Sequence, residues 1–478
     1  MQNEIEKMPA EDIETAAEIS AGKTADSPRS FVAGVFRALD KQGIRYCIFR
    51  DYHKLEQPTR DVEIDLLADP ADLKKLRQLL ARKGFVEIPS WGHAPHRFFV
   101  TYHKALNMWL KLDVITALRF GKPVSALEIG LRSSYLDHRT RRELAFVPAA
   151  EDKFLVLLLK CIINDGKFSE SRLRRLRELH NEILADPVGP DRISANLQKH
   201  FGNRLSWEEI DRAFQAADWQ QLLAKRKSLR RKLFAGQPLA TLWRQVKTRF
   251  LKRISPLLYL LRRRGVSVAL LAPDGAGKST LAETIIRQRH LNARFIYMGD
   301  NLKASNVGLP TTPWFKRKKK QKRNNPLIKL ILAVFNFPNS LLEQWYRSAV
   351  GGYYRSRGKF VVYDRYVYDS WINPPVTRMI KKIRRFLIER TCPTPDLVIL
   401  LDAPGAVLFA RKGEHTPEGL ETKRQAYLAL QKQLSNLLVV DATQDAQTVQ
   451  AEVIHMLWQY YRTRDLGKVR NGRNGQSG

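Results

Sequence analysis

The residues of this sequence best suited to chemistry lie in one segment, Ala272–Thr280, which reads APDGAGKST. It follows the apolar run Val266–Leu271 and precedes apolar residues at helical spacing, so it is predicted to join a strand to a helix. Backbone amides in such a turn, together with the positive end of the helix, bind phosphate oxygens. The residues predicted to surround the phosphates are Asp274, Gly275, Ala276, Gly277, Lys278, Ser279 and Thr280.

Three of these residues have distinct chemical uses. Gly277 lets the backbone turn closely, Lys278 can reach the β- and γ-phosphates of a nucleotide, and Ser279 can ligate Mg²⁺. Ala272 stands where the usual pattern has glycine, which is a mild departure. A glycine-containing turn without a ligand is the alternative, but strand, loop and helix occur here in the required order. The segment therefore predicts a binding site for ATP and Mg²⁺.

A carboxylate and a guanidinium, Asp364 and Arg365, follow a second apolar run, Phe360–Tyr363. A carboxylate beside a phosphate loop can hold Mg²⁺ or position an acceptor oxygen, and the guanidinium can bind a phosphate in a forked geometry. The alternative is that Asp364 caps the next helix, with Arg365 as its ion-pair partner. Asp402, at the end of another apolar run, is a second candidate for the carboxylate role.

A third group of charges lies in Ala410–Glu418, a segment punctuated by glycine and proline between two predicted helices. Phosphoryl transfer depends on cations around the transferred group, so a flap that brings Arg411 and Lys412 over the phosphates would suit it. An exposed polar loop is the alternative. His415 is predicted to be a surface residue rather than a base.

The loop and the strand-end residues follow apolar runs that indicate one buried parallel sheet. Helical segments separate the runs, as in successive βαβ units, and the ligands of such sheets bind at the carboxyl ends of the strands. The predicted strands are Val266–Leu271, Ala293–Met298, Phe360–Tyr363, Leu397–Leu401 and Leu437–Val440.

Residues 265–463 resemble the thymidylate kinase-like P-loop nucleoside-monophosphate kinases. The segments that carry the resemblance are Asp274–Thr280, Asp364–Tyr366, Pro395–Leu397, Leu401–Asp402 and Val440–Ala442. The resemblance implies a five-stranded parallel sheet flanked by helices, ATP and Mg²⁺ as cofactors, and a phosphorylated small-molecule acceptor. The oligomeric state stays open, with a homodimer as one alternative, since the resembling kinases are commonly dimers.

The same resemblance implies roles for individual residues. Asp274 would approach the sugar of the acceptor, and Asp364 and Arg365 would act at the phosphates. Since Gly275 stands where some members carry an arginine, Arg411 and Lys412 would supply that cation. The family's Arg-Glu-Pro segment after the second strand is replaced here by Gly299-Asp300 and a basic insertion. The acceptor therefore stays open between thymidylate and other phosphorylated molecules.

The N-terminal part carries three further carboxylates, Glu63, Asp65 and Asp113, on two predicted strands. This part more weakly resembles the nucleotidyltransferase fold, which implies that the three acids hold Mg²⁺ for nucleotidyl transfer. Glu63 replaces the family's usual aspartate, and the usual Gly-Ser turn is missing. A diverged, non-catalytic domain is one interpretation, and exposed acids on an alternating strand are another. The predicted strands are Arg45–Phe49, Val62–Leu67, His96–Tyr102 and Met108–Ile115, and the predicted helices are Phe31–Lys41 and 69–83.

The charge of the chain is strongly unbalanced, since 82 Lys and Arg residues against 48 Asp and Glu residues give a net charge of +34. Two segments without acids, Trp219–Pro273 and Asn301–Leu342, hold much of it. Three interpretations stay open: solvated linker charge, attraction to an anionic membrane beside Trp243, Phe250, Trp314 and Phe315, and, less favoured, binding of nucleic acid.

Targeting signals are not evident. Three scattered cysteines fit a reducing compartment, and the acidic N-terminus does not read as a secretory signal. The sequence therefore predicts a cytoplasmic protein, with peripheral contact to the inner face of the membrane as an open alternative.

The predicted organisation is α/β throughout, with two main domains. Its parts are a disordered tail (1–27), a nucleotidyltransferase-like α/β domain (28–150) with a helical extension (151–223), a basic linker (224–264), a P-loop kinase domain (265–463) and a disordered tail (464–478). The expected function is transfer of the γ-phosphoryl group of ATP to a nucleoside monophosphate or a similar acceptor. The alternatives are a kinase or nucleotidyltransferase acting on a sugar or lipid-linked precursor at the membrane, and a P-loop ATPase that binds nucleic acid or anionic lipid.

Overall fold

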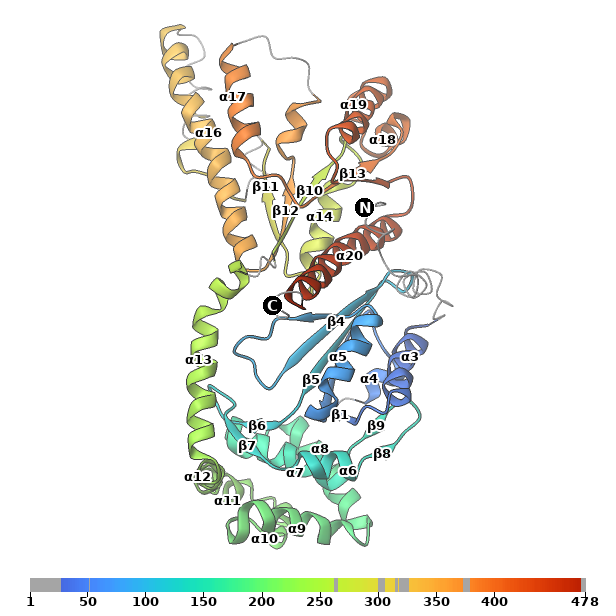
Figure 1. Cartoon of the computed structure of the whole chain (residues 1–478), viewed down its shortest axis with the longest axis vertical. Coiled ribbons are helices and arrows are strands. Elements are labelled where there is room, and N and C mark those ends of the chain that lie inside the picture. Colours follow the sequence, from blue (N-terminus) through green and yellow to red (C-terminus); the bar gives the residue numbers. More distant parts are fainter. Residues whose placement is uncertain are drawn as a thin grey trace. The chain divides into compact units, whose positions relative to one another are not determined.

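The computed structural model describes residues 27–50, 52–261, 265–299, 306–313, 317, 326–372 and 379–473 (Figure 1). Side chains 326–336, 380–381 and 465–473 are outside this description. The chain forms two compact units, the first from Met1–Arg253 with Asp465–Gly478 and the second from Ile254–Arg464. Each unit has its own sheet and its own core.

The first unit is built on a five-stranded mixed sheet with the order β1-β2-β5-β4-β3, in which β2 and β5 are parallel neighbours. Apolar residues of two helices, α3 and α5, pack against it to form a core. The strands are β1 (Tyr46–Arg50), β2 (Asp61–Ala68), β3 (Val86–Ile88), β4 (Arg97–His103) and β5 (Met108–Ile115), and the helices are α3 (Pro28–Lys41), α4 (His53–Glu56) and α5 (Leu73–Arg82). The four predicted strands are therefore present, and β3 is an addition at the sheet edge.

A largely helical extension continues the first unit around a second core. It includes two small hairpins, β6 (Leu118–Phe120) with β7 (Leu127–Ile129) and β8 (Thr140–Arg141) with β9 (Phe146–Val147). Its helices are α6 (Arg132–Asp137), α7 (Ala150–Leu159), α8 (Glu170–Ala185), α9 (Gly189–Phe201), α10 (Trp207–Gln215), α11 (Trp219–Ala224), α12 (Arg226–Gly236) and the part of α13 (Pro238–Leu261) up to Arg253. The basic segment 224–261 is therefore almost entirely helical, and Arg262–Arg264 lie outside the described residues.

The second unit contains a five-stranded, all-parallel sheet with the order β11-β12-β10-β13-β14, so the fold expected from the five apolar runs is confirmed. The central strand β10 lies between β12 and β13, and the loops after these three strands open at one edge of the sheet. The strands are β10 (Val266–Leu271), β11 (Arg294–Tyr297), β12 (Phe360–Asp364), β13 (Leu397–Asp402) and β14 (Leu437–Asp441).

Helices flank this sheet (Figure 1). They are α14 (Lys278–Arg287), α16 (Pro326–Ser356), α17 (Met379–Thr391), α18 (Gly405–Lys412), α19 (Pro417–Ala429) and α20 (Ala446–Arg473). Part of the basic insertion, with Trp314, Phe315, Lys316 and Lys318–Arg323, lies outside the described residues.

The ends of the chain differ in part from the predicted tails. Residues 1–26 are outside the described part, and Ser27 is the N-cap of α3. The predicted tail begins at residue 464, and residues 464–473 form the last part of helix α20. These residues contain no proline to end the helix. Among the described helices, none has the length and apolar character required to cross a membrane.

Candidate functional site

The segment Ala272–Thr280 forms the predicted loop between β10 and α14. Gly275 and Gly277 have φ angles of +91° and +88°, in the left-handed region that favours glycine. A Cβ atom on Gly275 would lie 2.7 Å from the carbonyl oxygen of Leu408 on α18. The loop is therefore packed against α18, and glycine at position 275 is required both by its backbone angle and by this close approach.

Lys278, the first residue of α14, turns back over the loop. Its ammonium donates hydrogen bonds to the carbonyl oxygens of Ala272 and Pro273, the second at 3.2 Å. Burial lowers the pKa of Lys278, and the negative charges of Asp369 and Asp364 oppose that effect. The ammonium of Lys278 therefore lies on the loop and interacts with the carboxylates of Asp364, at the end of β12, and Asp369.

Asp364, at the end of β12, has a buried carboxylate oxygen that accepts no hydrogen bond from the described residues. Its side chain is buried, and among the described residues none donates a hydrogen bond to its Oδ1 atom. Burial raises the pKa of Asp364, against the opposing charge of Lys278. A buried carboxylate oxygen without a partner is suited to a metal ion. Ser279, exposed in the first turn of α14, offers a second oxygen, so the residues present fit Mg²⁺.

Arg365 pairs with the loop rather than with Asp364. Its Nη2 atom lies 2.9 Å from Oδ1 of Asp274, so the sequence-based alternative of an Asp364–Arg365 ion pair is not what the structure has. Arg365 also has a φ angle of +58°, which is unusual for a residue other than glycine. Backbone strain of this kind often accompanies function.

Nitrogen atoms of several side chains surround the carboxylate of Asp274 beside the loop. Besides Arg365, the Nε2 atom of His415 lies 3.4 Å and the Nζ atom of Lys423 3.8 Å from its Oδ2. Burial alone would raise the pKa of Asp274, but the charges of Lys278 and Arg365 outweigh it and lower the pKa. His415 therefore lies at the loop, not at a remote part of the surface.

The two predicted flap cations are not equivalent. Arg411, in the last turn of α18, donates a hydrogen bond to the carbonyl oxygen of Ala442 at 2.8 Å, after β14, so its guanidinium does not point to the loop around Lys278. The Cβ of Lys412 lies 3.5 Å from where a Cβ on Gly275 would be, and its ammonium pairs with Glu414 at 2.9 Å. The segment predicted as one flap is the end of α18, a short turn and the start of α19, which fixes the direction of each side chain.

Sequence reasoning missed three residues of this site, Asp369, Tyr427 and Lys423. Asp369 lies in a 3₁₀ turn, Val367–Ser370, and burial raises its pKa from 3.8 to about 6. The hydroxyl of Tyr427 donates a hydrogen bond to its Oδ1 at 2.9 Å. Tyr427 lies four residues after Lys423 on α19, and this spacing, which puts both on one helix face, was the available signal.

Asp402, the second carboxylate candidate, is held by Arg424 through two contacts of 2.6 and 2.9 Å.

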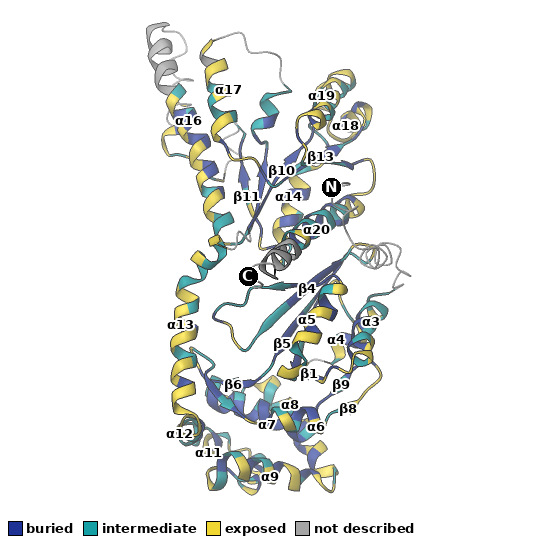
Figure 2. Ribbon diagram, in the orientation of Figure 1, coloured by how far each residue is buried: buried dark blue, intermediate teal, exposed yellow. Residues whose placement is uncertain are grey.

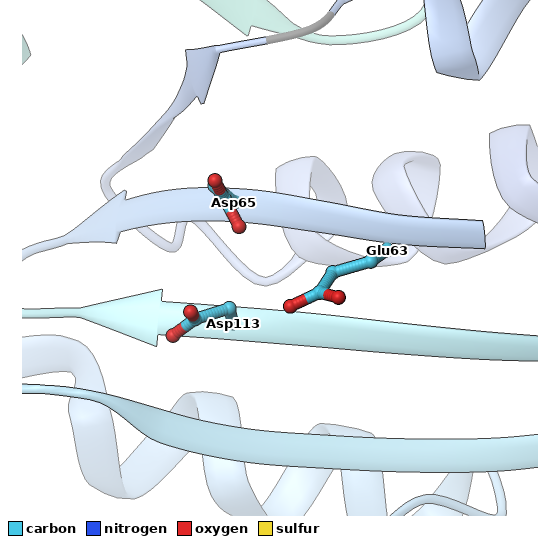
Figure 3. Close-up of side chains that lie close together, drawn as sticks. All are labelled: Glu63, Asp65 and Asp113. Atoms are coloured by element: carbon cyan, nitrogen blue, oxygen red, sulfur yellow. The ribbon is translucent and has the colours of Figure 1, made fainter. Parts of the chain in front are cut away.

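A second candidate site lies in the first unit, where Glu63, Asp65 and Asp113 point toward one another from β2 and β5 (Figure 3). One carboxylate oxygen of each lies within 4.8 Å of those of the other two. The parallel register pairs Asp65 with Asp113, which explains why acids 48 residues apart meet. Carboxylate oxygens are the ligands that Mg²⁺ prefers.

Each acid of this second site is already paired with a nitrogen of a neighbouring side chain. Lys111 lies 2.7 Å from Glu63, His96 lies 2.9 Å from Asp113, and Arg50 contacts Asp65. Burial raises the pKa of Asp65, and Arg50 opposes that effect. The three carboxylates therefore fit Mg²⁺ only when these three side chains turn away.

A cavity of about 580 Å³ lies beside this second site, and Arg50 belongs to both. Burial lowers the pKa values of two lysines in its wall, Lys153 and Lys160. Phe49, Tyr52, Tyr135 and Leu157 give the wall an apolar side. Its cationic residues are Arg50, Arg142, Lys153, Lys160, Arg172 and Arg175.

Comparison with protein families and with curated proteins finds no match for this chain. Among solved structures, the thymidylate kinase from Candida albicans is similar at 16% identity and a TM-score of 0.30, over 42% of this chain and 93% of that chain. A TM-score of 0.30 is too low to assign a fold or a function to this chain. The strand order, the parallel register and the loop after β10 are by themselves those of a P-loop kinase-like fold.

Proposed function

We propose that the second unit is an ATP-dependent phosphotransferase that transfers the γ-phosphoryl group to a phosphorylated small-molecule acceptor. The observation that supports this most directly is the convergence of Lys278 with Asp364 and Asp369 at the loop after β10. A cation inside a turn of backbone amides, opposite a carboxylate that has a free buried oxygen, is suited to a triphosphate and its metal.

Each residue has a proposed role. The loop amides and Lys278 bind the β- and γ-phosphates, and Ser279 with Asp364 holds Mg²⁺, which neutralises phosphate charge when bound. Arg365 and Lys423 are released from Asp274 by the more highly charged phosphates and move onto the transferred group. Lys412 stays at the outer side of the loop. Arg411, whose guanidinium holds the end of β14, is proposed as a positioning residue.

The acceptor is proposed to be a nucleoside monophosphate or a similar phosphorylated molecule, with Asp274 facing its sugar. Nucleotide biosynthesis in the cytoplasm is the simplest setting for such a reaction. A dimer is carried over from the resemblance alone.

Phosphoryl transfer from radiolabelled ATP to a panel of nucleoside monophosphates and sugar phosphates tests the proposal. We expect transfer by the full chain with Mg²⁺, a loss of at least about 100-fold in Lys278→Ala, and unchanged transfer in Lys432→Ala, an exposed lysine of the same unit. ATP hydrolysis without transfer to any acceptor would instead support an ATPase. No turnover of ATP by the wild type would contradict the proposal.

A second candidate function, nucleotidyl transfer by the first unit, is favoured by one observation, the meeting of Glu63, Asp65 and Asp113. The basic cavity beside them suits a nucleoside triphosphate. Release of pyrophosphate from nucleoside triphosphates, abolished by Asp65→Asn and retained in Lys278→Ala, would support it. Wild-type protein that releases no pyrophosphate with any of the four common nucleoside triphosphates would contradict it.

A further inference from the structure

Helix α13 packs on the first unit with its polar side. Within Pro238–Arg253, Thr241 and Thr248 are 0% and 9% exposed, and both point to the interior. Arg244 pairs with Glu128 at 2.9 Å and donates to the carbonyl oxygen of Ala126 at 3.3 Å. This side of the helix also meets the loop at Gly92, where an added Cβ would lie 3.2 Å from the carbonyl oxygen of Thr248. The orientation of the helix is therefore fixed by its contacts.

The opposite side of the same helix is apolar and open. Leu239, Trp243 and Phe250 are 82%, 65% and 59% exposed, and Leu242 and Val246 are exposed between them. Spacings of three, four and seven residues place all five side chains in one stripe. Figure 2 shows exposed residues along the length of this helix. A helix in a soluble domain normally turns such a stripe inward, so a stripe turned outward indicates a surface that something covers.

Basic side chains border the stripe on both sides. In helical projection Lys247 lies on one flank and Arg249 on the other, while Arg253 follows the stripe at its C-terminal end. All three are exposed. On the arginine flank, a cavity of about 590 Å³ is also lined by Lys122, Arg230 and Arg231. The sequence contains no acid from Trp219 to Pro273, so nothing within this segment offsets the positive charge.

We infer that this surface, the α13 face (Leu239, Leu242, Trp243, Val246 and Phe250 with Lys247, Arg249 and Arg253), binds an anionic phospholipid bilayer. An apolar stripe that contains tryptophan and phenylalanine, with cations on both flanks, matches the acyl region and the phosphate groups of such a surface at the same depth. The helix lies in the plane of the interface, because the buried threonine side stays on the protein. The net charge of +34 attracts the whole chain to the same surface.

Alternative occupants match this face less well. A second copy of the chain would bring an equally basic face, and the like charges on the flanks would repel. An apolar protein partner would leave the flanking cations without counter-charges. The bilayer supplies both the apolar layer and the anions. The inference concerns the first unit and needs no catalytic step, so it stands or falls separately from the proposed phosphotransferase activity.

Flotation of the full chain with vesicles tests the α13 face. We expect binding to phosphatidylcholine vesicles that contain about one third phosphatidylglycerol, and a fall of at least about 10-fold in the partition coefficient with phosphatidylcholine alone. Trp243→Ser with Phe250→Ser should lower partitioning to anionic vesicles at least about 10-fold. The matched control, Leu184→Ser with Val188→Ser, removes two exposed apolar side chains elsewhere in the first unit and should bind as the wild type does. Equal binding by the α13 variant would overturn the inference.

Two double variants with the same change in net charge distinguish the contribution of the flanking cations from that of the net charge. Lys247→Gln with Arg249→Gln should weaken binding to anionic vesicles about 10-fold, since each basic residue near the surface contributes. Lys74→Gln with Arg82→Gln makes the same change in net charge on α5 and should weaken it less. Equal losses in the two variants would show attraction by net charge only and would overturn the assignment to α13.

A label on the helix distinguishes lipid from protein as the occupant. The three native cysteines are buried, so Val246→Cys can be labelled selectively with an environment-sensitive dye. We expect a blue shift of its emission when anionic vesicles are added, and no shift for a label at Leu184→Cys. Emission that is already blue-shifted without vesicles would show that another part of the chain, or a second copy, covers the face. That result would overturn the inference.

Discussion

The buried carboxylate of Asp369, near Lys278, affects the stability of the protein. Burial raises the pKa of Asp369 to about 6, so the folded protein resists ionisation of a group that ionises freely when unfolded. Between pH 4 and pH 6 the unfolded chain releases this proton first, and the free energy of unfolding therefore falls as pH rises through that window. Above it the penalty is constant. Such a cost at a buried carboxylate is consistent with a site shaped for a ligand.

Asp369→Asn removes that cost while keeping an oxygen for the hydroxyl of Tyr427. We expect the variant to be more stable than the wild type by about 1–3 kcal/mol at pH 7, and by almost nothing at pH 4. Urea unfolding at the two pH values measures the difference. Glu283→Gln, on the exposed side of α14, is the control and should change stability little at either pH. A difference for Asp369→Asn that is the same at both pH values would contradict the prediction.

Arg365 offers a second test at the level of one residue, because its backbone and its side chain can be separated. Asparagine tolerates a φ angle of +58° but has no charge, so Arg365→Asn should keep or slightly raise the melting temperature. Its rate of phosphoryl transfer should fall by about 100- to 1,000-fold, since a cation at the transferred group is lost. Steady-state kinetics and thermal unfolding of one preparation check both parts. A lowered melting temperature with near-normal kcat would reverse the assignment and make Arg365 structural.

At the scale of elements, the phosphate loop depends on α18 as well as on α14. Gly275→Ala would place a Cβ atom 2.7 Å from the carbonyl oxygen of Leu408, at a φ angle of +91°. We expect a loss of about 1–3 kcal/mol in stability and weaker ATP binding, because the loop must move away from α18. Gly352→Ala is the matched control. It lies in α16 with open space at its Cβ position and should stabilise the protein by about 0.5–1 kcal/mol.

Unfolding in urea and calorimetric titration with ATP compare these two glycine variants. A Gly275→Ala protein as stable as the wild type, with unchanged ATP affinity, would mean that α18 yields to the loop. In that case the close approach would not explain why this position carries glycine.

The elements that sequence reasoning found and missed differ in how they bury their residues. The three central strands of the parallel sheet, β10, β12 and β13, are buried on both faces. Val266–Leu271 therefore appears as an uninterrupted apolar run and was predicted with its correct bounds. The short hairpin strands β6 to β9 offer two or three residues each, too few for a periodic signal. The spacing of Leu242, Trp243, Val246, Phe250 and Leu251 predicts one apolar helix face, and the first four of these side chains are exposed together. The sequence could not predict that this face would point away from the unit, because that depends on tertiary contacts of Thr241 and Thr248.

The residues of the site also divide into those that the sequence predicts and those that it does not. The loop and Asp364 were predictable because each follows an apolar strand directly, and parallel strands bring their carboxyl ends to one edge. Asp369 and Tyr427 were not, since their contact joins a 3₁₀ turn to a helix 58 residues later. Arg411 shows that proximity in sequence to a suitable segment does not fix where a side chain points.

At the scale of the whole molecule, the distribution of charge and the division into two units can be tested separately. The acid-free segment Trp219–Pro273 supplies part of the net charge of +34 and spans the junction of the units, where α13 leads toward β10. Each unit nevertheless has its own sheet and its own apolar core. Separate cores suggest that ligands of one unit can be detected without a change in the other.

Scanning calorimetry of the full chain should accordingly resolve two unfolding transitions. ATP with Mg²⁺ at about 100 times its dissociation constant for the loop after β10 should stabilise the transition of the second unit by about 2.7 kcal/mol, because the folded second unit binds it there. Gly275→Ala identifies that transition by lowering it alone, and Lys278→Ala should remove its response to ATP. Glu63→Gln, in the first unit, should leave the response intact. One transition that moves as a whole with ATP would show that the two cores unfold together and that each stabilises the other.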